Sequence, residues 1–294
     1  MAANWLHPTH AITRGLPRSF ANALQMSAPP VSIDVDVARQ QHDAYNNLIM
    51  KLVPNWVGLP ADESVPDCLF VEDTAFFVPI EGTSQTTKEP LECVCVITRP
   101  GADSRKPEVP PVHNCIVHMG MPKDQVFEVT EPGTIDGGDV MYTPQALWIG
   151  LSKRTNQAAV DQVASFLQAY NVPVVAFSMG SGGHVLHLKS VVTLLDSDCL
   201  LVADNDTGRH VVAQAEAHPL LKGKFKYVYV PDQLAANVLR IGSHVVMQAG
   251  FPASGDIVRA ECAARGLTVH TLGMGETAKA DGALTCCSLL FRLP

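Results

Sequence analysis

The chain has 294 residues, of which 47% are hydrophobic and 17% are charged, and its formal net charge is −8. This composition provides ample apolar side chains for a large core, while the scattered Lys and Arg residues argue against a nucleic-acid or membrane surface. No segment approaches the ~20 consecutive apolar residues of a membrane-spanning helix. The eight cysteines include no CxxC pair, which favours a reducing, cytoplasmic location.

Three segments show the apolar periodicity of amphipathic helices. The first, residues 35–52, follows Asp34 or Asp36 as N-cap, and the second, within 154–170, begins after Thr155 or Asn156 as N-cap. Their apolar stripes are Ala38, Gln41, Tyr45, Leu48 and Leu52, and Ala159, Val163, Phe166 and Tyr170. Residues 255–266 are a shorter candidate, whereas residues 106–120 contain too many prolines to predict a helix.

A polar motif precedes an apolar, strand-like run five times along the chain. The polar markers are Glu72, Asp136, His187, Asn237 and Cys286, at intervals of 64, 51, 50 and 49 residues. Alternating strands and helices with this spacing predict one α/β domain over residues 1–294, with its modules around an axis and the markers directed toward a shared centre. The alternative is that about 50 residues is simply the length of any α/β repeat.

The chain ends in DGALTCCSLLFRLP, which resembles a half-buried strand. Alternation would place Thr285, Cys287 and Leu289 on an apolar face and Cys286 on the opposite face. If one thiol faces a polar cavity, this parity favours Cys286. The alternative is a last strand with two buried structural thiols, since free cysteine is among the most buried residue types.

The markers include the components of a thiol nucleophile. A free cysteine has a pKa of ~8.5, so it needs a nearby imidazolium or a cationic substrate to become a thiolate at neutral pH. The imidazole in turn needs an acceptor that fixes its orientation, which is commonly a carboxylate. Cys286, His187 and Asp136 provide this set, and the glycines of the DGGD loop (136–139) allow close backbone approach and unusual φ values.

Further charged residues indicate a zwitterionic substrate. Asp67, Glu72 and Asp73 match the fork of N–H donors of a guanidinium, while Arg105 and Arg154 match a carboxylate. For each arginine taken alone, a surface role is the simpler interpretation.

Seven motifs in order resemble dimethylarginine dimethylaminohydrolase. They are LPADESVPDCLFVED, ITRPGADSRK, IDGGDV, GLSKRTN, LHLKS, PDQLAAN and DGALTCCS, and they span residues 59–288. The resemblance implies a pentein fold, a five-bladed propeller of ββαβ units with pseudo-fivefold symmetry. It is shared with arginine deiminase and the amidinotransferases.

The resemblance also implies roles for single residues. Cys286 matches the nucleophile, His187 the general acid/base and Asp136 its orienting carboxylate. The ligands of the substrate would be Asp67, Glu72 and Asp73 for the guanidinium, Arg105 and Arg154 for the α-carboxylate, Leu24 in a lid loop, and Ala280 through its backbone.

The expected activity is hydrolysis of N-methylated L-arginines to L-citrulline and an amine, in control of methylarginine inhibitors of nitric oxide synthase. No cofactor is expected. The expected partner is a small-molecule substrate, with neither nucleic acid nor membrane, and a homodimer is compatible with the sequence. Two alternatives are an arginine deiminase- or amidinotransferase-like enzyme, and a zinc-binding regulatory protein that uses His184, His187, Cys286 and the aspartates. HxxH without a glutamate on a helix is a poor zinc signature.

Overall fold

A computed structural model describes residues 4–83, 90–180 and 185–293. The strands are β1 (His10–Arg14), β2 (Asn55–Leu59), β3 (Ala75–Thr83), β4 (Pro90–Ile97), β5 (Val126–Glu128), β6 (Val140–Tyr142), β7 (Leu147–Leu151), β8 (Val174–Ser178), β9 (Val192–Asp196), β10 (Cys199–Ala203), β11 (Lys226–Val230), β12 (Leu239–Ile241), β13 (His244–Gln248), β14 (Thr268–Leu272) and β15 (Leu289–Phe291). The α-helices are α1 (Val35–Leu52), α2 (Val109–His118), α3 (Gln157–Gln168), α4 (Asp206–Ala217), α5 (Pro252–Ala264) and α6 (Gly275–Ala278). None of these helices is long and apolar enough to cross a membrane.

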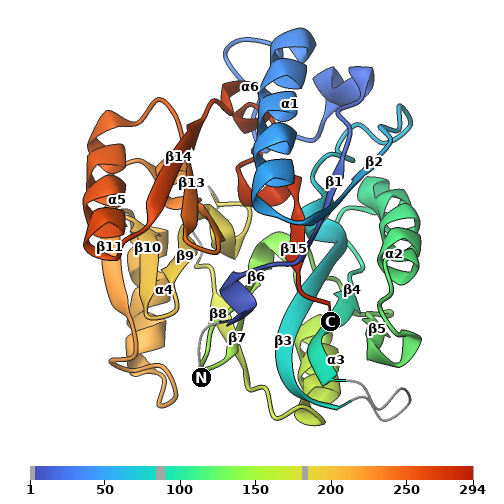
Figure 1. The fold of residues 1–294 in the computed structure, drawn as a ribbon, viewed down its shortest axis with the longest axis vertical. Helices are drawn as coiled ribbons and strands as arrows, with labels where there is room; N and C mark the ends of the chain where they lie inside the picture. Colours follow the sequence, from blue (N-terminus) through green and yellow to red (C-terminus); the bar gives the residue numbers. More distant parts are fainter. Residues whose placement is uncertain (1–3, 84–89, 181–184, 294) are drawn as a thin grey trace.

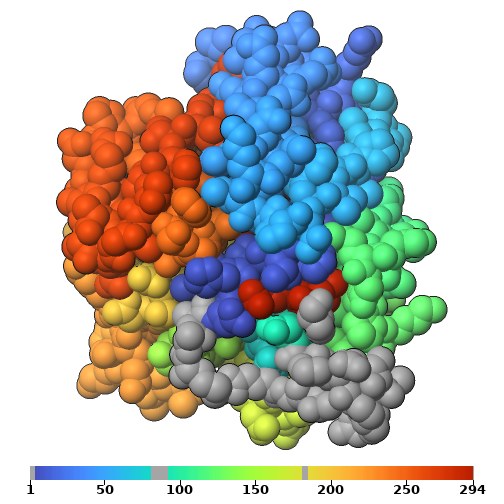
Figure 2. All heavy atoms as spheres, in the orientation of Figure 1, coloured from blue at the N-terminus to red at the C-terminus, as the bar shows by residue number. Residues whose placement is uncertain are grey.

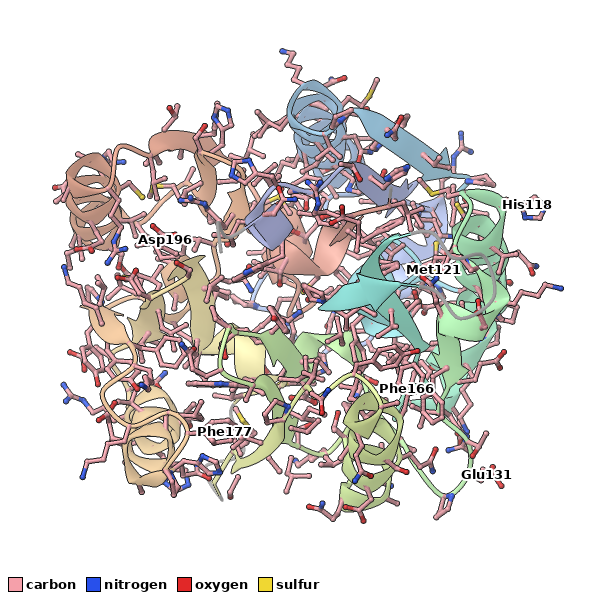
Figure 3. All side chains as sticks on the ribbon, turned by 60° about the horizontal axis from the view of Figure 1, so that its bottom comes forward. His118, Met121, Glu131, Phe166, Phe177 and Asp196 are labelled. Carbon is pink, nitrogen blue, oxygen red and sulfur yellow. The ribbon has the colours of Figure 1, made fainter. Side chains whose placement is uncertain are left out.

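The described strands form five three-stranded sheets arranged as a ring (Figure 1). The strand orders are β15-β1-β2, β3-β4-β5, β6-β7-β8, β11-β10-β9 and β12-β13-β14. In each sheet the first strand along the module pairs antiparallel with the middle strand, which pairs parallel with the third. A parallel pair needs a long crossover, and one of α1 to α5 provides it in every module. Figure 3 shows these helices around the outside and the strands inside them, with His118 at the end of α2 on the outer edge. The five ββαβ units predicted from the resemblance are therefore confirmed.

The ring is closed by the two ends of the chain. β15 pairs antiparallel with β1, with His10 opposite Phe291 and Ile12 opposite Leu289. In Figure 2 the blue N-terminal and red C-terminal segments lie side by side near the middle of this face. The mostly apolar C-terminus is thus an inner strand of the first module, which explains why it carries no run of charge.

Two of the helices begin at predicted caps. Asp34 accepts hydrogen bonds from the backbone N–H groups of Asp36 and Val37, and Asn156 accepts one from Ala159. On α1, Ala38 and Tyr45 of the predicted stripe are buried, but the buried face also includes His42 and Ile49, while Gln41, Leu48 and Leu52 are only half-buried.

Residues 106–120, for which the prolines left the sequence without a helix prediction, contain a helix. Helix α2 begins at Val109, and its prolines lie in the first turn. A proline there removes no intrahelical hydrogen bond, because the first N–H groups of a helix have no partner in it.

Each of the five markers lies in or beside a short 3₁₀ turn before an inner strand. The turns are η3 (Val71–Thr74), η6 (Gly137–Asp139), η7 (Leu188–Ser190), η8 (Gln233–Ala236) and η9 (Thr285–Cys287). The predicted strand at Thr285–Cys287 is therefore wrong, because the chain makes a turn there and becomes extended only from Ser288 onward. The five turns contact one another near the axis, so the modules bring distant residues together as the spacing predicted.

Candidate active site

Most of the predicted site residues surround one small pocket between the 3₁₀ turns, with a volume of about 110 Å³. Its lining includes Leu24, Asp67, Asp73, Arg105, Arg154, His187, Ala280 and Cys286. The other two predicted residues do not line it: Asp136 lies behind His187, and Glu72 faces a different cavity.

The two adjacent cysteines have different environments. Cys286 is half-buried and lines the pocket, whereas Cys287 is fully buried and its thiol points back to the carbonyl of Ala283 at 3.7 Å. The 3₁₀ turn separates the thiols, since successive residues of such a helix are about 120° apart. Burial, followed by the carboxylates of Glu72 and Asp73, raises the pKa of the Cys286 thiol well above its ordinary value. Without a bound cation this thiol is therefore protonated at neutral pH.

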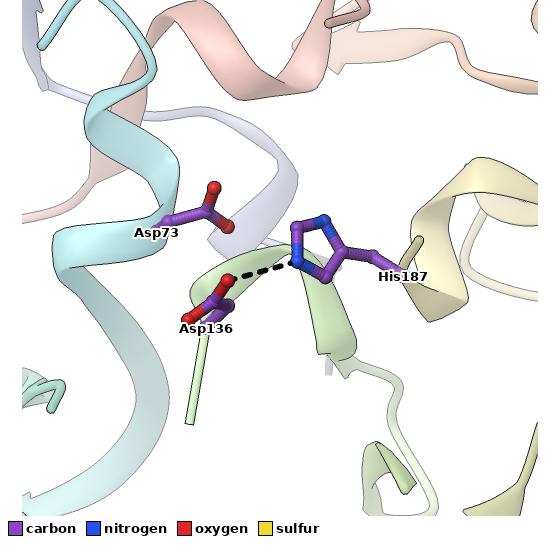
Figure 4. Close-up of side chains that lie close together, drawn as sticks. All are labelled: Asp73, Asp136 and His187. Atoms are coloured by element: carbon purple, nitrogen blue, oxygen red, sulfur yellow. Dashed lines mark hydrogen bonds and ion pairs between the residues drawn. The ribbon is translucent and has the colours of Figure 1, made fainter. Parts of the chain in front are cut away.

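His187 and Asp136 form a buried pair (Figure 4). His187 Nε2 lies 3.0 Å from Asp136 Oδ2, and the backbone N–H of Gly101 donates to the other oxygen, Oδ1, at 2.9 Å. Burial alone would lower the pKa of His187, but the carboxylates of Asp73, Asp139 and Asp136 outweigh it and raise the pKa to about 9. The imidazole is therefore an imidazolium at neutral pH, which donates its Nε2–H to Asp136.

The glycines of the DGGD loop are required by close packing. A Cβ on Gly137 would lie 1.9 Å from the carbonyl oxygen of Glu72, and one on Gly138 would lie 2.5 Å from Nδ1 of His187. The close backbone approach predicted from the sequence is therefore found. The unusual φ values are not, because neither glycine has a positive φ.

Asp139, the last residue of this loop, is a functional candidate to which the sequence analysis gave no role. Its carboxylate accepts hydrogen bonds from Ser152 Oγ at 2.6 Å, Thr155 Oγ1 at 2.7 Å and the backbone N–H of Leu188 at 2.9 Å. Burial raises its pKa to about 6. The hydrogen bond to Leu188 fixes the residue that follows His187. In the sequence, the second aspartate of DGGD was the feature that could have indicated this role.

Asp73 is held in place as an anion. Its two oxygens accept from Arg105 Nη1 at 2.5 Å and from the N–H of Gly138 at 2.8 Å. Burial opposes its ionisation, but His187 and Arg105 outweigh burial and lower the pKa of Asp73 to about 2.

Arg105 is more deeply buried than a simple carboxylate clamp requires. Its Nε and Nη2 atoms donate to Glu108, and Nη2 also donates to the carbonyl of Phe70. With Asp73 on Nη1, a single Nη1–H remains for a ligand. Arg154 is less engaged: its side chain is 18% exposed, and its nearest carboxylate oxygen, on Asp136, is 3.5 Å away.

Glu72 faces away from the pocket. Its carboxylate contacts Lys189 Nζ at 2.5 Å and Thr285 Oγ1 at 2.9 Å. All three residues line a larger cavity of about 230 Å³, whose lining shares no residue with the pocket of Cys286. We assign the active site to the smaller cavity because the thiol and the imidazole both line it.

Two backbone hydrogen bonds attach the N-terminal loop to the rim of the pocket. The N–H of Leu24 donates to Asp67 at 3.1 Å, and the N–H of Met26 donates to Asp281 at 2.6 Å. Leu24 is 38% exposed and Ala280 is buried, and both line the pocket. Asp281, which has a positive φ of 57°, is a rim residue that the sequence analysis did not single out.

Asp73, Asp136 and His187 offer ligand atoms within 4.8 Å of one another, the spacing of a metal site. Each of these groups already has a protein partner of opposite charge, and an imidazolium does not bind a metal. Of the proposed zinc ligands, His184 lies outside the described residues.

Comparisons with known proteins show the family of this chain. The sequence profile of the arginine deiminase family matches residues 114–240. The N(G),N(G)-dimethylarginine dimethylaminohydrolase of Pseudomonas aeruginosa is 30% identical over 286 residues, which cover 96% of this chain and 99% of the relative. The chain belongs to the dimethylarginine dimethylaminohydrolase family. The protein of the same name from Streptomyces coelicolor is also 30% identical, over 96% of both chains.

Solved structures of dimethylarginine dimethylaminohydrolase have the same fold. One is a Cys-to-Ser mutant of the Pseudomonas aeruginosa enzyme in complex with citrulline, which matches with a TM-score of 0.79 and 28% identity. The match covers 97% of this chain and 100% of that chain. The protein is therefore a pentein hydrolase related to dimethylarginine dimethylaminohydrolase.

Proposed function

We propose that this protein hydrolyses N-methylated L-arginines to L-citrulline and methylamine or dimethylamine. The observation that carries the proposal is the pocket itself, in which one half-buried thiol and one imidazolium lie among carboxylates. The carboxylates of this pocket complement a guanidinium in charge and in the geometry of its N–H donors, and its two arginines complement a carboxylate. The citrulline complex of the Pseudomonas aeruginosa structure supports the same chemistry.

In this proposal the substrate lies between two groups of opposite charge. Asp67 and Asp73 accept hydrogen bonds from the guanidinium, and Glu72 contributes its negative charge from behind Asp73. At the other end, Arg154 binds the α-carboxylate, assisted by the remaining Nη1–H of Arg105. Leu24 and Ala280 enclose the substrate from the lid and the opposite wall.

Binding of the substrate activates the nucleophile. A guanidinium carbon about 4 Å from the sulfur stabilises a thiolate by about 4 kcal/mol at an effective dielectric constant near 20, which lowers a pKa by about 3 units. That change opposes the effects of burial, Glu72 and Asp73 on the pKa of the Cys286 thiol. The thiol is therefore a weaker nucleophile before a cation binds than after it.

The reaction then proceeds in two stages. When the substrate binds, the Cys286 thiol loses its proton to solvent, because His187 already carries a proton on each ring nitrogen. The Cys286 thiolate then attacks the guanidinium carbon, and the His187 imidazolium gives its proton to the methylated nitrogen, which leaves as a neutral amine. A water oxygen then adds to the thiouronium carbon as one of its protons passes to His187. The C–S bond breaks, the remaining hydroxyl proton is lost to solvent or to the released amine, and citrulline and the thiolate are released. Asp136 keeps His187 oriented and charged throughout, and no cofactor takes part.

Arginine deiminase activity is the second candidate, because the profile of that family matches residues 114–240. Incubation of the purified protein with asymmetric dimethylarginine and arginine together separates the two. We expect citrulline and dimethylamine with little ammonia, whereas ammonia as the main amine product would assign the protein to arginine deimination.

A further inference from the structure

A closed ring of hydrogen bonds joins four of the five inner turns at the axis of the propeller. Thr285 Oγ1 donates to Glu72 Oε2 at 2.9 Å, and the other oxygen of Glu72 pairs with Lys189 Nζ at 2.5 Å. Asn237 completes the ring through its Nδ2, which donates to the backbone oxygen of Lys189 and to Thr285 Oγ1, each at 3.0 Å. The backbone N–H of Thr285 also donates to Oδ1 of Asn237, at 3.0 Å.

The amide of Asn237 is specifically suited to this position. The residue is only 2% exposed, and both Nδ2 hydrogens and the Oδ1 oxygen are used. An aspartate could accept from Thr285 but could not donate, and an apolar side chain could do neither. A buried network in which every group has a partner fixes one arrangement of the segments that it joins.

The ring lies directly behind the proposed catalytic groups without entering their pocket. Thr285 precedes Cys286, Glu72 precedes Asp73, and Lys189 belongs to the turn that begins after His187. Neither Asn237 nor Thr285 lines the pocket of Cys286. Their hydrogen bonds therefore act on the relative positions of the groups that do.

We propose that Asn237 and Thr285 are positioning residues, which hold the turn of Cys286 in register with the turn of His187. This inference rests on the proposed function of those two residues. The turn of Cys286 is also held by α1, so loss of its register with His187 can be distinguished from unfolding. Tyr45 on α1 donates its hydroxyl to the carbonyl of Leu284 at 2.9 Å and contacts Ser288 Oγ at 2.7 Å. When the ring is broken, the turn remains attached to α1 but is free to shift relative to His187.

Replacement of Thr285 provides a matched pair of variants. Thr285→Val keeps the shape and removes the hydroxyl, whereas Thr285→Ser keeps the hydroxyl and removes only a methyl group. We expect kcat to fall by about 10²-fold in Thr285→Val and in Asn237→Ala, with KM within threefold of wild type, because a misplacement near 1 Å has such an effect on rate. Thr285→Ser should retain at least a third of wild-type kcat.

Asn205→Ala is the control for loss of stability. Asn205 also makes two amide hydrogen bonds, which are partly buried: its Oδ1 accepts from the backbone N–H of Gly208 and its Nδ2 donates to Gln233 Oε1, but it caps α4 away from the pocket. This variant should have a lower melting temperature and wild-type kcat. Equal losses of kcat in Asn205→Ala and Asn237→Ala would overturn the inference, and so would Thr285→Val with kcat within threefold of wild type.

A second measurement needs no substrate. It therefore tests the role of the hydrogen-bonded ring even if the protein does not hydrolyse methylarginine. The rate of alkylation of Cys286 by iodoacetamide, followed by peptide mass spectrometry, should rise at least threefold at pH 8 in Thr285→Val and Asn237→Ala, because the loosened turn is more exposed. Thr285→Ser and Asn205→Ala should react like wild type. An unchanged rate in the first two variants would contradict a positioning role, whereas absence of citrulline release by the wild type would contradict only the proposed substrate.

Discussion

Replacement of Asp136 by Asn tests how His187 is charged and oriented. Oδ1 of Asp136 accepts from the N–H of Gly101 at 2.9 Å and its Oδ2 from Nε2 of His187 at 3.0 Å, with a longer contact from Arg154 Nη1 to Oδ2 at 3.5 Å, and the residue is fully buried. An amide has one oxygen, so it cannot accept both. If that oxygen stays with Gly101, the NH₂ group faces Nε2, which must then be an unprotonated acceptor.

The expected loss follows from this geometry. The variant removes one of three carboxylates that together raise the pKa of His187 to about 9, and its NH₂ group favours the neutral imidazole. The leaving amine then lacks its proton donor. Loss of general acid–base assistance lowers kcat by ~10²–10⁴, which is about 3–5 kcal/mol of transition-state stabilisation.

Steady-state citrulline release from asymmetric dimethylarginine over pH 6–10 measures this effect. We expect kcat to fall at least about 10²-fold, KM to change little, and covalent adduct formation to be slow in rapid-quench experiments. Asp232→Asn is a control, because Asp232 also accepts a hydrogen bond, from Ser254 Oγ at 2.7 Å, but lies outside the pocket. A wild-type kcat with an unchanged pH profile in Asp136→Asn would show that the DGGD loop is only a structural turn.

Three further predictions concern the thiols, the arginine and pH. Cys286→Ser should abolish citrulline release, and activity in this variant would contradict the assignment of Cys286 as the nucleophile. Cys287→Ser should keep most activity and lower the melting temperature, because it places a hydroxyl in the core. Arg154→Ala should raise KM for methylarginine by about 10- to 100-fold but leave KM for a methylguanidine without a carboxylate nearly unchanged. Equal effects on the two KM values would contradict binding of the α-carboxylate by Arg154. The His187 imidazolium, with its pKa raised from 6.5 to about 9, stabilises the fold fully below pH 6.5 and loses this effect as pH rises through 9. Denaturant titrations should therefore show the stability advantage of wild type over His187→Gln shrinking by about 3 kcal/mol between pH 6 and pH 10, and a constant difference would contradict the charged imidazole.

The sequence predicts the helices and the repeat of the modules better than the short 3₁₀ turns near the axis. Apolar periodicity and capping residues locate α1 and α3, and the near-equal marker spacing anticipates the ring. The same periodicity cannot distinguish a three-residue 3₁₀ turn from the start of a strand, because both are too short to show a period. The sequence therefore predicts an extended Thr285–Cys287. The predicted difference in burial between Cys286 and Cys287 is nevertheless found, because the 3₁₀ turn, rather than strand alternation, separates the two thiols.

Residue roles that depend on tertiary partners could not be predicted from spacing. Glu72 resembles a substrate ligand in the VED motif, yet both its oxygens are bound by protein groups contributed by other modules. Asp139 and Asn237 belong to sequence motifs, but the hydrogen bonds by which they join different turns depend on the folded structure. Arg105 was expected at the surface or on a substrate, but it is buried between Asp73 of η3 and Glu108, the last residue of the 3₁₀ turn Asp103–Glu108 that precedes α2.

The most direct test of the account is the identity of the covalent adduct. The purified protein should be quenched in acid during turnover of asymmetric dimethylarginine and, separately, of monomethylarginine, and then digested and analysed by mass spectrometry. Because the methylated nitrogen leaves before hydrolysis, we predict the same methyl-free thiouronium from both substrates, located on Cys286. An adduct that retains methyl groups, an adduct on another residue, or efficient turnover in Cys286→Ser would contradict the account.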